Sequence, residues 1–194
     1  MRLRPWQACW CLTTLTDGNS EKVAASATGI VPRLVAFIAG MQGSDDEQFE
    51  ASTRVATAAS AALMSLTTEN ACKAIAVKAG AVRVLAELVG DPAAQAELSE
   101  QMGEDCGYAP LVTAGGPDDR DAQRRVHATG ETLIQNVTKC IANLAEHPVA
   151  RKKLSKGKGE RTALSELVAL GGSTKEPLLM KNVAIAIEKV TWTP

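Results

Sequence analysis

The sequence predicts an all-α protein in which helices stack as repeated units. One observation is an internal repeat: QACWCLTTLTDGNSEKVAASATGIVPRLVAFI, which begins at Gln7, aligns without a gap with the segment that begins 51 residues later at Ala58. A second is an apolar helical pattern that recurs four times along the chain. A third is the composition, 45% hydrophobic but only 3% aromatic, because chains rich in Ala, Leu and Val favour close helix packing over a β-sandwich.

The apolar pattern places side chains at i, i+3, i+4 and i+7, which is one face of an α-helix. The first copy lies in a helix expected over about 5–16, and the others follow at successive offsets of 51, 78 and 46 residues. A unit of about forty residues with loops of unequal length explains these offsets. We call the four faces the stripes: Ala8, Cys11, Leu12 and Leu15; Ala59, Ala62, Leu63 and Leu66; Val137, Cys140, Ile141 and Leu144; Val183, Ala186, Ile187 and Val190.

Between successive stripes the sequence predicts two further helices joined at a glycine. Gly29, Gly80 and Gly159 each precede a leucine by five residues, and a glycine there suits a left-handed corner between helices. Pro32 then falls in the first turn of the helix expected after Gly29, where a missing N–H costs little. The expected unit is a short helix, a glycine corner, a second helix, a loop and a long third helix.

This pattern resembles the armadillo repeat, through the segments TENACKAIAVKAGAVRVLAELV and GNSEKVAASATGIVPRLVAFI. The resemblance implies a right-handed α-solenoid of about three repeats, with the third helices lining a concave groove that binds proteins. The expected plan is one domain over 1–194: a partial repeat at 1–16, then repeats at 17–68, 69–145 and 146–194.

Two features depart from regular repeats. An insertion at 91–125 is expected to contain an extra helix after Asp91 and a Gly- and Pro-rich loop before a lengthened third helix. The chain also opens directly in a third helix, so we expect this N-terminal helix to contact another chain or missing repeats.

The resemblance also supplies candidate groove residues. In importin alpha, paired Trp and Asn on successive third helices hold an extended peptide; here Trp10 and Asn143 match, whereas Thr14 stands at an Asn position and Lys139 at a Trp position. The structural alternatives are that Asn143 bonds a neighbouring helix end and that Trp10 covers the exposed terminus. The candidate groove residues are Trp10, Thr14, Ser65, Lys139, Asn143 and Lys189.

A basic run forms the densest charge in the chain. It would suit an acidic protein segment or phosphates, and the alternative is a solvated helix and loop without a ligand. The candidate basic patch comprises Arg151, Lys152, Lys153, Lys156, Lys158 and Arg161.

Other classes of protein are disfavoured. A net charge of -1 argues against bulk nucleic-acid binding, and no apolar run reaches bilayer length. Neither a metal-binding spacing nor a phosphate loop nor a nucleophile elbow is present, so we expect no enzyme activity and no cofactor. Five cysteines without CxxC spacing indicate buried free thiols, Cys11, Cys72 and Cys140 among them, in an intracellular, cytoplasmic protein, with cytoskeletal or nuclear association left open.

The sequence therefore favours a non-catalytic protein–protein interaction scaffold, a subunit or fragment of a larger assembly. The alternative is an adaptor that binds an extended peptide in the groove, as in nuclear transport. A third hypothesis is a surface for phosphates or acidic lipids at the basic patch.

Overall fold

A computed structural model describes residues 5–16, 20–40, 46–91, 133–156 and 162–192. Within these ranges every regular element is an α-helix, which confirms the all-α class. The helices are α1 (Pro5–Thr16), α2 (Ser20–Ala39), α3 (Asp46–Leu66), α4 (Asn70–Lys78), α5 (Ala81–Val89), α8 (Leu133–Leu144), α9 (Pro148–Ser155), α10 (Ala163–Ser173) and α11 (Pro177–Thr191).

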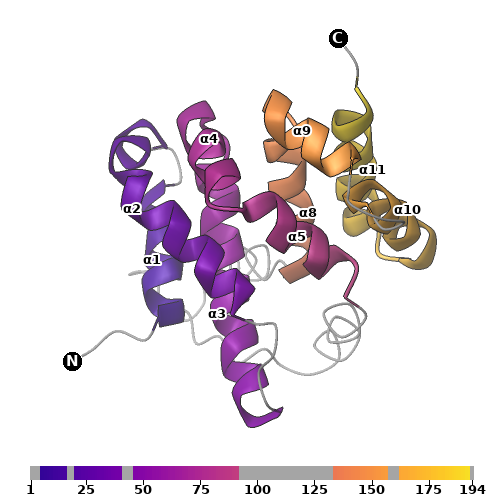
Figure 1. The fold of residues 1–194 in the computed structure, drawn as a ribbon. Coiled ribbons are helices and arrows are strands. Elements are labelled where there is room, and N and C mark those ends of the chain that lie inside the picture. The colour runs from indigo at the N-terminus through magenta and orange to yellow at the C-terminus, as the bar shows by residue number, and fades with distance from the viewer. Residues whose placement is uncertain (1–4, 17–19, 41–45, 92–132, 157–161, 193–194) are drawn as a thin grey trace, which may run out of the picture.

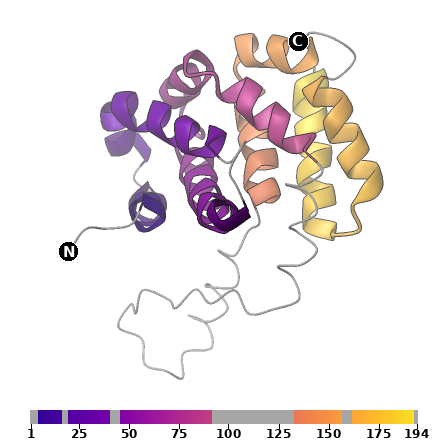
Figure 2. The same ribbon diagram turned by 60° about the horizontal axis from the view of Figure 1, so that its bottom comes forward.

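Four helices form a row that follows the order of the sequence. These are α1, α3, α8 and α11, which carry the four stripes and are called here the stripe helices; each packs against the next. Three others, the covering helices α2, α5 and α10, pack on α3, α8 and α11 respectively. The colours in Figures 1 and 2 accordingly pass from indigo at α1 to yellow at α11, with these two helices at opposite ends of the row.

The faces of α3 explain why it sits inside the row. Successive residues of an α-helix are rotated by about 100° around its axis, which gives α3 three distinct sides. Ser60 and Thr67 lie toward α8, and Ser65 lies toward α1. The stripe occupies the third side, where α2 packs. All four stripe residues of α3 and all four of α8 are fully buried. Leu66 of α3 and Leu85 of α5 are fully buried, as expected.

The glycine corner is present at Gly80. This residue has φ 86° and ψ 12°, in the left-handed region, and it separates α4 from α5. A side chain is strained there, whereas glycine adopts this conformation without cost from a Cβ. The chain therefore turns at Gly80 as the sequence predicts.

The same prediction is wrong at Gly29. Residues 20–39 form one continuous helix, α2, so neither a corner at Gly29 nor a helix start near Pro32 exists. Pro32 lies inside this helix, on an exposed position, while Val31 and Leu34 beside it are buried. Apolar packing of α2 on α3 thus outweighs the local helix-breaking tendency of the two residues. Gly159 and the expected structure of the insertion before Leu133 lie outside the described residues.

Candidate functional site

The candidate groove residues lie on all four stripe helices at equivalent positions. Thr14 on α1, Ser65 on α3, Asn143 on α8 and Lys189 on α11 are related by the same offsets as the stripes. Because the four helices pack in sequence order, these residues follow one another along the row. The structure then shows what each polar group contacts.

Asn143 links two neighbouring stripe helices. Its Nδ2 donates to the backbone oxygen of Met64 at 3.1 Å and to the Thr67 hydroxyl at 3.4 Å, at the end of α3. The hydroxyl of Thr16 donates to Ser65 at 2.7 Å in the same way, between α1 and α3. These side chains hold adjacent helices together, which is the structural alternative that the sequence left open for Asn143.

At the α1 end of the row, Trp10 is half-buried and packs against the hydrophobic core. The Thr14 hydroxyl donates to the Trp10 carbonyl at 3.2 Å within the same helix. Lys139 is half-buried on α8. A Trp and Asn pair on one helix, as the armadillo resemblance implies for peptide capture, does not occur in the described residues, and peptide binding stays a prediction.

Glu146 forms a junction that the sequence did not reveal. Its carboxylate accepts hydrogen bonds from Lys189 of α11 and from Lys73 of α4, whose side chain is only 3% exposed. The bonds from Lys189 and then from Lys73 lower the pKa of the Glu146 carboxyl below its ordinary value. Because the three residues lie far apart in the sequence, no local pattern could have joined them.

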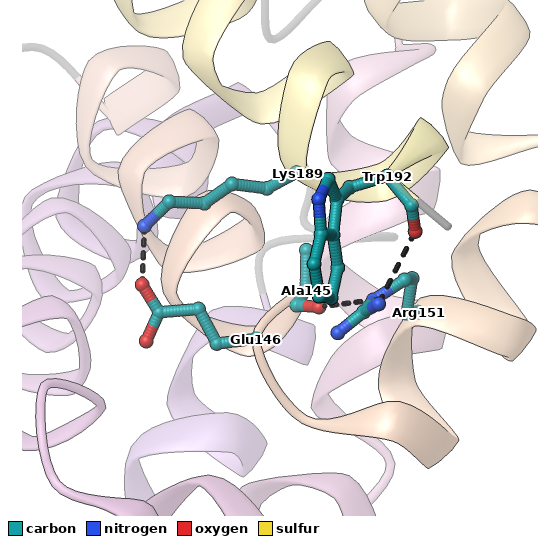
Figure 3. A pocket seen from close by; sticks show the side chains of 5 residues that line it. All are labelled: Ala145, Glu146, Arg151, Lys189 and Trp192. Atoms are coloured by element: carbon teal, nitrogen blue, oxygen red, sulfur yellow. Dashed lines mark hydrogen bonds and ion pairs between the residues drawn. The ribbon is translucent and has the colours of Figure 1, made fainter. Parts of the chain in front are cut away.

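A shallow pocket of about 250 Å³ lies beside this junction (Figure 3). It is lined by Ala145, Glu146, Arg151, Lys189 and Trp192. The Arg151 guanidinium donates to the carbonyl oxygens of Ala145 at 2.9 Å and Trp192 at 3.2 Å, and stacks 4.8 Å from the centre of the Trp192 ring. The arginine therefore holds the residue that follows α11 against the start of α9.

The rest of the basic patch divides in two. Lys152, Lys153 and Lys156 are exposed on and just after α9, whereas Lys158 and Arg161 lie outside the described residues. Arg151 is already engaged with two carbonyl groups and an aromatic ring, so it is less available to an external anion than the sequence suggested.

The stripe of α1 differs from the other three. Ala8, Cys11 and Leu15 are exposed, Leu15 by 66%, and Leu12 is half-buried, although the equivalent residues of α3 and α8 are fully buried. The prediction of a buried thiol is therefore wrong for Cys11. The equivalent Cys140 is buried against α3, the preceding stripe helix, and no described helix precedes α1 in the row. Cys9, one residue earlier, is the buried thiol of this helix.

The chemistry of the remaining thiols is that of core residues. Cys72 and Cys140 are buried and free, as expected. Burial raises the pKa of the Cys9, Cys72 and Cys140 thiols, which keeps them protonated and unreactive. Among the described residues no three His, Cys, Asp or Glu side chains are placed to hold a metal ion. Nor does any described helix have the length and apolar character that a membrane span requires.

Comparison with protein-family models, with curated proteins and with solved structures finds no match to this chain.

Proposed function

We propose that the chain is an armadillo-like α-solenoid that acts as a non-catalytic scaffold for protein–protein interaction. The observation that supports this most is the row of stripe helices, in which each helix packs against the next and three carry a covering helix. Such units bury their apolar faces only by stacking on one another, which builds an extended surface instead of a closed core.

The contacts that the polar side chains make also favour a scaffold over an enzyme. Asn143, Glu146 and Arg151 are the most elaborately bonded polar residues of the candidate site, and each joins two segments of the chain. Side chains that hold helices together stabilise the array and leave its surfaces to contact a partner. The exposed stripe of α1 is one apolar part of that surface.

Affinity capture with the immobilised chain tests this function. Leu15→Glu alters the exposed stripe, and Val168→Glu is a matched control because Val168 is also exposed, at 56%, but lies on the covering helix α10. We expect specific proteins to be retained by the wild type and by the control, and at least one to be lost from the Leu15→Glu chain. Retention of no protein above the level of a chemically unfolded sample would contradict the scaffold.

A further inference from the structure

The uncovered stripe of α1 is chemically almost the same as the covered stripe of α3. In repeat order, Ala8, Cys11, Leu12 and Leu15 correspond to Ala59, Ala62, Leu63 and Leu66, so only one position differs and both side chains there are small. The two helices differ in their neighbours: α1, α2 and α8 pack on α3, whose stripe is fully buried, whereas the stripe of α1 is left largely exposed.

The opposite side of α1 is already used in the manner of the other stripe helices. Its buried residues are Cys9 and Thr16, and α3 is the helix that packs along it. The equivalent residues of α3, Ser60 and Thr67, contact α8. α1 therefore occupies the row in the regular orientation. Among the described residues its stripe has neither a covering helix nor the contact with a preceding stripe helix that Cys140 of α8, the equivalent of Cys11, makes with the Ser60 carbonyl of α3.

The covering helices show what chemistry fits a stripe. In α2, four buried aliphatic residues recur at i, i+3, i+4 and i+7, and they are Val31, Leu34, Val35 and Ile38. α5 buries Leu85 and Leu88 in the same way. An aliphatic, amphipathic helix laid across α1 would meet residues of the kind that α2 meets on α3. Because α1 carries no charged residue between Pro5 and Thr16, the contact needs no matching charge.

We propose that the stripe of α1 binds an amphipathic α-helix of a partner protein, in the way that α3 binds α2. This proposal rests on the proposed scaffold function and names the partner's chemistry. A second copy of the chain fits less well, because the other end of the row exposes Lys181, Glu188 and Thr191 on α11.

Cys11 provides a probe inside the stripe. In the experiment, a maleimide labels the native chain in the presence of a synthetic peptide with the sequence of residues 20–39. Mass spectrometry of the digested chain then quantifies the labelling of each cysteine. At a peptide concentration about ten times the dissociation constant, labelling of Cys11 should slow about tenfold. Only chains without bound peptide expose Cys11 to the maleimide, and at this concentration they are about one tenth of the total. A peptide carrying Leu34→Glu and Ile38→Glu should give no protection, and neither should the normal peptide with the Leu15→Glu chain.

Four results would overturn the proposal. Protection that is equal with the two peptides, or that persists in the Leu15→Glu chain, would place binding elsewhere. Absence of protection up to the solubility limit of the peptide would show that the stripe accepts no such helix. Slow labelling without peptide would mean that the stripe is already covered, by a second copy if the rate depends on chain concentration and by another part of the chain if it does not. A partner captured equally by the wild-type and Leu15→Glu chains would leave the scaffold function standing while this inference fails.

Discussion

Alanine substitutions at Gly80 and Gly29 should change the stability of the protein in opposite directions. Gly80 has φ 86°, and a Cβ added there meets no atom within 4 Å, so the cost is that of the left-handed backbone alone, about 1–2 kcal/mol. Gly29 lies inside α2, also with no atom within 4 Å of an added Cβ. Alanine there should stabilise the helix by about 0.5–1 kcal/mol.

Urea unfolding followed by circular dichroism measures both effects. We expect the midpoint to fall for Gly80→Ala and to rise for Gly29→Ala with the slope unchanged, since both variants expose the same surface on unfolding. The two free energies of unfolding should differ by about 2 kcal/mol. Equal effects of the two substitutions, or a Gly80→Ala chain as stable as the wild type, would refute the assigned corner and the continuous α2.

Three further results are expected. Leu66→Ala and Leu85→Ala should each lower the free energy of unfolding by about 2–5 kcal/mol, because both side chains are fully buried. A decrease of less than about 0.5 kcal/mol, measured by urea unfolding, would contradict the alignment of the repeats that places these residues in the core. The lowered pKa of Glu146 means that its contribution to stability is present above the ordinary carboxyl pKa of about 4.3 and is lost as pH falls through the lower folded-state pKa. The stabilities of wild type and Glu146→Gln should therefore converge as the pH falls below about 4.3, and a constant difference would contradict the junction. Arg151→Ala should make Trp192 more accessible to acrylamide quenching, with the other two tryptophans replaced by Phe; unchanged quenching would show that the stacking does not hold the ring.

The sequence predicts the helices and their buried faces well because these depend on local periodicity. The stripe of α8 shows this clearly: Val137, Cys140, Ile141 and Leu144 follow the helical spacing, and all four are buried. The corner at Gly80 was also predictable, since few residues other than glycine adopt its φ.

The errors arise where contacts from elsewhere in the chain decide the outcome. Gly29 and Pro32 suggest a break, yet α2 continues because its aliphatic face packs on α3. Cys11 lies in an apolar pattern and is nevertheless exposed, because burial of a stripe requires neighbouring helices as well as the pattern. The site at Glu146 joins side chains from α4 and α11, and such a pairing leaves no signal in a single sequence.

The native labelling rates of Cys11 and Cys140 test the central claim most directly. The two thiols occupy equivalent stripe positions on α1 and α8. In the described part of the chain Cys11 is exposed, whereas Cys140 is buried and its thiol donates to the Ser60 carbonyl of α3. The account predicts that Cys11 reacts with a maleimide at least about 100-fold faster, because Cys140 becomes accessible only when α8 opens. Similar rates at the two thiols, whether both fast or both slow, would contradict a row of equivalent helices in which α1 alone is uncovered.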